Sequence, residues 1–364
     1  MVTIDEYKCP NCAGAVKFDS SAQKMKCPYC DAEFETSVIV EYQKNAVAET
    51  QAADSFKWTD DAVIAWKEDE LDGLSTGSCP SCGAELVGDQ NTVAMVCPCC
   101  GNAQIVSKRL VGMMKPNYVI PFKLDKKAAV AALQDFCKDK RLLPDFFVEH
   151  NHINRIQGLY VPFWLFDAKA SGNMRFKATK VKYWMDSTYN YIKTDHYSII
   201  RDGALNFEKV PVDGSEKMDD DYMDSIEPFH YTDIKEFHST FLAGYTAEKY
   251  DVDASKSRDR AARRIKSSLE RAFAKSVTGY ATVIPERSIV SVHDGKVSYA
   301  FFPVWVLNTK YNDANYTFMM NGQTGRLVGR LPVDSGKAWK YRLLIAGILG
   351  LVSTGVILLT QMLR

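Results

Sequence analysis

Hydrophobic and polar positions divide the chain into a cysteine-rich first part, a long central part and an apolar end. In the central part, residues 160–166 and 301–307 are continuously apolar, which is typical of buried strands. Apolar residues at helical spacing predict amphipathic helices over about 126–140 and over 253–276. The centre therefore combines helices with strands.

These central elements recur in the same order, which predicts a duplicated α+β domain over 111–336. Each copy begins with a short apolar segment containing proline, continues through a helix to a buried strand, and ends at Pro-Val-Asp. The buried strands share a proline followed by tryptophan two residues later, at Pro162 and Trp164 and at Pro303 and Trp305. Asn321-Gly322 between alternating runs predicts a hairpin in the second copy.

The predicted helix over 253–276 has two chemically different sides. Ala262, Ile265, Leu269 and Phe273 form its apolar side, and the helix also carries eight lysines and arginines: Lys256, Arg258, Arg260, Arg263, Arg264, Lys266, Arg271 and Lys275. The simplest interpretation is a solvated face opposite a core face. The alternative is contact with anionic lipid headgroups or nucleic acid.

The chain ends in a segment, 337–364, whose residues Leu343 to Leu363 include no charged side chain. At 1.5 Å per residue a helix of this length spans about 30 Å, the thickness of a bilayer core. The pattern predicts one transmembrane helix, a single-pass C-terminal anchor in the cytoplasmic membrane. Lys337, Lys340 and Arg342 precede it, which places the N-terminal domains in the cytosol.

Small residues form a stripe along this helix at Ala346, Gly350 and Thr354. Such stripes allow helices to approach closely in lipid. We therefore expect the lipid bilayer to be a partner through 343–363, and we keep a homo-oligomer through the same helix as a hypothesis.

Eight of the ten cysteines form four Cys-x-x-Cys pairs before residue 101. Within each set of two pairs, fourteen residues separate the pairs, and the second set repeats the first after 70 positions. This spacing predicts two tandem zinc ribbons, at 1–40 and 77–110, joined by an acidic linker at 41–76. The predicted metal ligands are Cys9, Cys12, Cys27, Cys30, Cys79, Cys82, Cys97 and Cys100.

Four thiolates at this spacing suit a tetrahedral zinc ion, so two zinc ions per chain are expected. Iron of the rubredoxin type is the alternative, because iron also accepts four thiolates. Cys100 is preferred to Cys99 as the fourth ligand of the second ribbon because it preserves the 70-residue shift. Cys99 is then spare, and Cys137 is a core residue.

Other motifs give little reason to predict an enzyme. Cys27-Pro28-Tyr29-Cys30 resembles a glutaredoxin site, but it has a ribbon partner upstream. Residues 73–77 match the G-x-S-x-G pattern without a following helix, and they run directly into Cys79. His150 and His152 lie in a polar segment, where solvent exposure is more common than metal binding. The sequence has no phosphate-binding loop of the ATPase type.

Charge helps to choose between classes of partner. The chain has 45 basic and 45 acidic residues, and the first ribbon is slightly acidic. Four thiolates around zinc add two negative charges. Phosphate binding requires clustered lysine and arginine, so protein partners are favoured over nucleic acid.

The chain also resembles a group of bacterial, mostly Firmicute, membrane proteins described as TFIIB-type zinc-ribbon-containing. The resemblance rests on six segments: two contain cysteine pairs, 9–12 and 26–30, and four lie in the central part, 119–124, 161–164, 211–215 and 321–325. Some members carry names borrowed from the primosomal replication-restart helicase, whose nucleotide-binding motifs this chain lacks. The resemblance implies the architecture without an activity.

Together these observations predict a multidomain α+β protein that is not an enzyme. We expect a membrane-tethered, zinc-binding adaptor or scaffold that binds proteins at the cytosolic membrane face. The alternative is a membrane-held nucleic-acid-binding protein without its own ATPase.

Overall fold

The computed structural model describes residues 7, 9–10, 15–28, 32–40, 54–59, 66, 74–89, 96–102, 105–108, 114–138, 140–145, 155–312 and 314–362. The strands are β1 (Lys17–Asp19), β2 (Lys24–Lys26), β3 (Glu33–Phe34), β4 (Ser55–Trp58), β5 (Leu74–Ser78), β6 (Glu85–Asp89), β7 (Val106–Lys108), β8 (Tyr118–Val119), β9 (Gln157–Met185), β10 (Asn190–Asp213), β11 (Lys235–Glu236), β12 (Thr246–Glu248), β13 (Thr282–Tyr311), β14 (Ala314–Asn321) and β15 (Leu327–Gly329). The helices are α4 (Lys126–Lys138), α6 (Asp220–Ile226), α7 (Ala254–Ser276) and α8 (Ser335–Met362), with 3₁₀ turns η2 (Tyr231–Asp233) and η3 (Ser239–Leu242).

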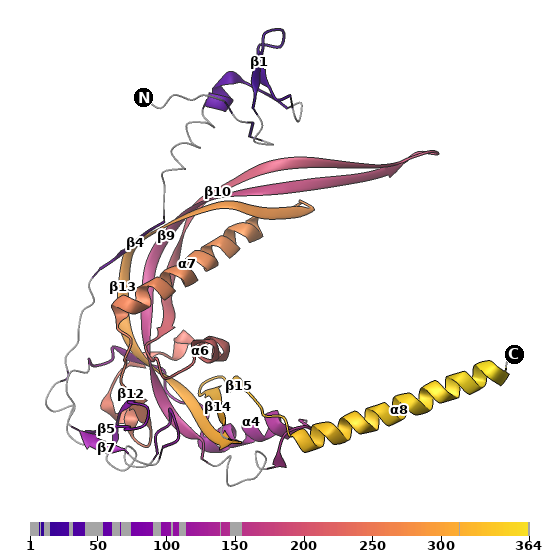
Figure 1. Ribbon diagram of the computed structural model, residues 1–364. Coiled ribbons are helices and arrows are strands. Elements are labelled where there is room, and N and C mark those ends of the chain that lie inside the picture. Colours follow the sequence, from indigo (N-terminus) through magenta and orange to yellow (C-terminus); the bar gives the residue numbers. More distant parts are fainter. Residues whose placement is uncertain are drawn as a thin grey trace. The chain divides into compact units, whose positions relative to one another are not determined.

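Strands dominate the described part of the chain, so the predicted α+β fold class is wrong. Most described strands belong to one large sheet, and helices are few (Figure 1). The strands β9, β10 and β13 contain 29, 24 and 30 residues, far more than their apolar runs. Continuous apolar runs in the sequence mark only the strand segments that are buried on both faces. The remainder alternates between inward and solvent-facing side chains, which hides a strand from a search for such runs.

Several local predictions are confirmed. The predicted buried strands over 160–166 and 301–307 lie within β9 and β13. The predicted helices over 126–140 and 253–276 correspond to α4 and α7. The predicted acidic linker, 41–76, is a separate case, because the strand β4 and the start of β5 lie within it.

The chain forms two compact units, each built from three separate stretches of the sequence. Unit 1 comprises 1–61, 166–210 and 258–297, and unit 2 comprises 62–165, 211–257 and 298–364. The strands β9, β10 and β13 each contribute a segment to both units.

Unit 2 is built on a sheet whose strand order is β11-β8-β13-β9-β12-β6-β5-β7. The short strand β12 joins two parts of this sheet. It runs parallel to β9, with Thr246 opposite Leu159, and antiparallel to β6, with Ala247 opposite Val87. β14 and β15 extend the sheet from β13 through the predicted hairpin.

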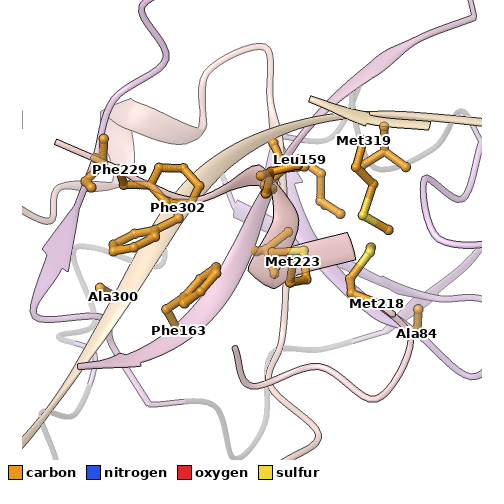
Figure 2. Packing of buried hydrophobic residues seen from close by; sticks show 14 of the residues in the cluster. Ala84, Leu159, Phe163, Met218, Met223, Phe229, Ala300, Phe302 and Met319 are labelled. Atoms are coloured by element: carbon orange, nitrogen blue, oxygen red, sulfur yellow. The ribbon is translucent and has the colours of Figure 1, made fainter. Parts of the chain in front are cut away.

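An apolar core covers one face of the unit 2 sheet. Phe163 of β9 and Phe302 of β13 stack with ring centroids 4.4 Å apart, and Phe229 packs against both (Figure 2). Met223 of α6 and Met218, which precedes that helix, complete this cluster. Fully buried aromatic side chains of this size contribute about 1.5–3 kcal/mol each through burial.

The opposite face of the same strands packs on α4. Ala129, Leu133 and Cys137 of α4 contact Trp305 and Leu307 of β13. Successive β13 residues therefore alternate between the two cores, because side chains along a strand point alternately to opposite faces. Cys137 is a core residue, as its helical position predicts.

In unit 1, α7 packs on the strand segments of β9, β10 and β13. Ile265 and Leu269 are fully buried against Ala168, Ala170 and Val290. The helix lies so close that a Cβ on Gly172 would come within 2.7 Å of Leu269 Cδ2. This confirms the predicted core face of the helix.

The first cysteine-rich segment has its own small sheet, with the order β1-β2-β3. Its core contains Cys9, Val16, Met25, Cys27 and Ile39. A ribbon of short antiparallel strands around cysteines is therefore present here.

The C-terminal helix requires a correction. Among the residues that the structure describes, no helix is long and apolar enough to cross a membrane. The prediction of a single-pass transmembrane helix and of a C-terminal membrane anchor is therefore wrong. The hypothesis of a homo-oligomer formed through this helix in lipid depended on the predicted transmembrane helix.

Candidate metal centre

The first loop of the centre connects β5 to β6 and contains Cys79 and Cys82. The backbone N–H of Cys79 donates to the Ala84 carbonyl at 2.9 Å, and that of Gly83 donates to the Cys79 carbonyl at 2.9 Å. Gly83 has a φ of +75°, which glycine adopts readily because it lacks a Cβ. These bonds fold the loop back so that both cysteines face the same point.

The second loop repeats this geometry around Cys97 and Cys100. The N–H of Cys97 donates to the Asn102 carbonyl and that of Gly101 to the Cys97 carbonyl, both at 2.8 Å. Gly101 has a φ of +76°. Two loops of the same shape therefore meet with two cysteines each.

The four sulfur atoms of Cys79, Cys82, Cys97 and Cys100 lie within 4.8 Å of one another. The Cys79–Cys100 distance is 3.6 Å and the Cys82–Cys97 distance is 3.7 Å. Four sulfurs placed about 2.3 Å from a tetrahedral zinc ion lie about 3.8 Å apart, so the set fits such an ion. A disulfide would need about 2.05 Å.

The thiols of this group have different proton affinities. A hydrogen bond from Cys99 lowers the pKa of Cys97 to about 5, against the opposing effect of its burial. Burial raises the pKa of Cys82 and Cys100. Thiolates are the metal-binding form, and a divalent cation offsets the burial penalty of several thiolates in one place. The four-cysteine group could therefore hold a metal ion.

Cys99 is next to the cluster without belonging to it. Its thiol is partly buried and its pKa is raised well above the usual value, first by the hydrogen bond to Cys97 and then by burial. The structure thus groups Cys100, not Cys99, with the other three cysteines.

The centre is held within the unit 2 sheet by several strands. β6, which leaves the first loop, pairs with β12, and the Lys249 ammonium contacts the Glu85 carboxylate at 2.8 Å. The Asn308 side chain donates to the Pro98 carbonyl in the second loop at 2.5 Å. Thr317 donates to Asn308 Oδ1 at 2.6 Å, which fixes the orientation of that amide. Cys79 and Cys97 are also part of the main apolar core.

Sequence reasoning did not find Glu248, a carboxyl group buried beside the second loop. Its side chain is 1% exposed, and the Ser215 hydroxyl donates to Oε1 at 3.0 Å. Burial raises the pKa of Glu248 to about 8, so the acid is largely protonated at neutral pH. No local signal marks it, because Glu248 is buried only through the pairing of β12 between β6 and β9.

The other predicted ligands are only partly described. Cys9 and Cys27 are buried in the small ribbon core, and the Cys27 N–H donates to the Ala32 carbonyl at 2.9 Å, as in the loops of the second ribbon. Cys12 and Cys30 lie outside the described residues. Within the described ranges, the cysteines of the second ribbon form the one group able to hold a metal.

The remaining candidates from the sequence have simpler explanations. Ser75 of the G-x-S-x-G match is inside strand β5, not on a turn before a helix. His150 and His152 lie outside the described residues. In α7, Lys266 forms an ion pair with Asp54 at 2.5 Å, and the apolar side is core.

Comparison with known proteins gives one relevant relative. The uncharacterized protein YdjG of Bacillus subtilis (strain 168) is 33% identical over 338 residues, which cover 92% of this chain and 93% of that protein. The chain belongs to the YdjG family. No protein-family model and no solved structure matches the chain. The matched length is far greater than one cysteine motif, so YdjG is similar to this chain over most of its length.

Proposed function

We propose that this chain is a non-enzymatic scaffold, an adaptor in which a structural metal ion stabilises a β-sheet body that binds other proteins. The observation that supports this most is the construction of the four-cysteine group. The group offers four protein sulfurs, as many as a tetrahedral ion takes, and two of them belong to buried core residues. Catalytic zinc sites keep one position open for water or substrate. A site with four protein ligands and no open position is therefore suited to a structural role.

We further propose that the metal is zinc and that each chain binds two ions. The 3.6 and 3.7 Å sulfur separations match the edges of a zinc–thiolate tetrahedron. Cys9 and Cys27 of the first ribbon are buried at equivalent positions in its loops, which supports a second site. Metal analysis of the purified chain should give two zinc ions per chain. Iron would instead give visible absorption from thiolate charge transfer.

Protein partners are a better match than nucleic acid. The basic helix α7 uses its apolar side for the core of unit 1, and Lys266 is paired with Asp54. The net charge of the chain is zero, so no general attraction to phosphate is expected. The TFIIB-type resemblance is compatible with this proposal, because ribbons of that type bind proteins as well as nucleic acids.

The test is affinity capture of the full-length chain from its own cells, with and without nuclease. Cys79→Ser with Cys82→Ser removes two ligands, and Cys137→Ala removes a buried cysteine of α4 and serves as the matched control. We expect specific proteins to be captured by the wild type and by Cys137→Ala, to resist nuclease, and to be lost with the double variant. Capture that depends on nucleic acid, or that the double variant retains, would contradict the proposal.

A further inference from the structure

The outer end of the β9–β10 hairpin is a two-stranded ribbon exposed to solvent. The third strand, β13, begins at Thr282, and the Ala281 N–H donates to the Thr179 carbonyl at 2.7 Å. Beyond that point β9 and β10 continue together to their connecting turn (Figure 1). We call residues 180–194 the hairpin tip. Every residue from 182 to 194 is exposed.

The hairpin tip carries an unusual concentration of exposed apolar and aromatic side chains. Tyr183 is 73% exposed, Trp184 51%, Met185 76%, Tyr189 65% and Ile192 68%. Single exposed apolar side chains are ordinary on protein surfaces. Five exposed apolar side chains within ten residues are a concentration of the kind that marks an interaction site.

Folding of the hairpin explains only part of this group. Trp184 stacks on Tyr191 across the strands at 5.3 Å, and the Asp186 carboxylate accepts the N–H groups of Thr188 and Tyr189 in the turn. These contacts give the tip a defined conformation. They provide no reason for exposed apolar side chains at Tyr183, Met185 and Ile192.

The charges of the hairpin tip are mainly positive. Residues 180–194 contain Lys180, Lys182 and Lys193 and one acid, Asp186, which is held in the turn. Lys193 is paired with the next acid, Asp195, at 2.9 Å, so Lys180 and Lys182 carry the excess positive charge. The lysines lie behind the apolar end, toward the body of the hairpin. Lys180 lies over the rings of Tyr197 and Tyr280, at 5.5 and 5.0 Å from their centroids. An anionic partner that also offers an apolar medium would complement this arrangement.

Both faces of the ribbon require such a partner. Along β9, Val181, Tyr183 and Met185 point to one face, while Lys182 and Trp184 point to the other. A flat protein surface covers one face of a ribbon. The interface of a bilayer surrounds an inserted tip on all sides, accepts tyrosine and tryptophan at headgroup level, and attracts lysine to lipid phosphates.

We propose that the hairpin tip docks on the surface of an anionic lipid bilayer. Tyr183, Trp184, Met185 and Ile192 enter the headgroup region, and Lys180 and Lys182 contact the lipid phosphates. This contact is peripheral and uses strands, so it is independent of any membrane-crossing helix. It adds a site to the scaffold proposed above and does not depend on the metal centre.

The test is hydrogen–deuterium exchange on the full-length chain, read at peptides from the hairpin tip. The chain is measured alone, with phosphatidylcholine vesicles, and with vesicles of equimolar phosphatidylcholine and phosphatidylglycerol. We expect protection of the tip only with the anionic vesicles, and loss of that protection at high salt. This local readout separates the hairpin from any other part of the chain that touches lipid.

Two variants sharpen the test. Tyr183→Ser with Met185→Ser and Ile192→Ser keeps the Trp184–Tyr191 stack, and it should weaken vesicle-dependent protection by roughly tenfold or more. The matched control is Ile284→Ser, since Ile284 is 61% exposed on β13 of the same unit. It should leave the protection unchanged. Lys180→Glu with Lys182→Glu should abolish the preference for anionic vesicles.

Three results would overturn the proposal. The first is unchanged exchange of the tip when the chain is mixed with anionic vesicles. The second is equal protection by neutral and anionic vesicles. The third is protection by a single-stranded oligonucleotide but not by vesicles, which would make the aromatic and basic tip a nucleic-acid platform.

Discussion

The two cysteine ribbons share one spacing but differ in what their strands join. In the first ribbon, β1, β2 and β3 form a separate three-stranded sheet with a core of its own. In the second ribbon, β6 pairs with β12, and through β12 the metal loops join the sheet that holds the core of unit 2. Identical cysteine spacing therefore defines the local loop geometry, but not how much of the surrounding fold depends on the centre. That dependence is set by the strand with which the ribbon pairs, here β12.

Removing metal ligands should have the largest effect and should separate the ribbons. Cys79→Ser with Cys82→Ser should destabilise unit 2 by more than about 4 kcal/mol, because the loops would lose their metal and leave buried thiols without partners. Cys9→Ser with Cys27→Ser should leave the main unfolding transition in place. Calorimetry of both variants provides the measurement. Equal losses from the two variants would remove the distinction between the ribbons.

A cavity in each ribbon should give the same contrast on a smaller scale. Leu86→Ala, at a position 1% exposed in β6, should cost about 2–5 kcal/mol of unit 2 stability. Met25→Ala in β2 is the matched change in the first ribbon. We expect it to alter exchange only within the small sheet. Chemical denaturation followed by tryptophan fluorescence reports the first change, and a global shift from Met25→Ala would argue against a separate first ribbon.

The buried acid beside the second ribbon predicts a pH dependence that the first ribbon has no reason to show. The pKa of Glu248 is raised from 4.5 to about 8 by burial, so the folded chain retains a proton that the unfolded chain releases. Stability from this group is fully present below about pH 4.5 and decreases as the pH rises toward 8.

Glu248→Gln should therefore remove this slope and stabilise the chain at pH 8 by a few kcal/mol, at about 1.4 kcal/mol per unit of pKa shift. Unfolding measured from about pH 6 to 8, where the thiolates still hold metal, provides the test. Glu236→Gln, on the exposed strand β11, is the control and should change nothing. An unchanged slope in Glu248→Gln would mean that the carboxyl is ionised in the folded chain.

Much of the candidate metal centre could be predicted from the sequence, because cysteine spacing is a local property. The 70-residue shift selected Cys100 over Cys99, and the structure groups Cys100 with the other three ligands. The buried segments of β9 and β13 and the helices α4 and α7 were also evident from their apolar patterns.

The long-range features could not be predicted in this way. The pairing of β6 with β12 joins residues about 160 positions apart, and no local pattern records it. The outer parts of β9 and β10 lack a continuous apolar run because buried and more exposed side chains alternate along them. The apolar end of α8 showed the opposite problem, because hydrophobicity alone predicted a membrane crossing that the described helix does not support.

The smallest expected effect concerns the amide that holds the second loop. Asn308→Ala removes the hydrogen bond to the Pro98 carbonyl and leaves Thr317 without its acceptor. A loss of about 1–2 kcal/mol is expected, with a faster release of metal to a chelator. Asn190→Ala, at the exposed start of β10, is the control. Metal release at the wild-type rate would show that the loop is held by its own backbone bonds.

The most direct test of the structural role of the centre is hydrogen exchange of the full-length chain before and after removal of metal by a chelator. Peptides covering β5, β6 and β12 report on the second ribbon and its sheet, and those covering β1 to β3 report on the first. We predict that metal removal exposes β5, β6 and β12 together and extends into the neighbouring segment of β9. Protection of β12 and β9 that is unchanged in the metal-free chain would contradict the account.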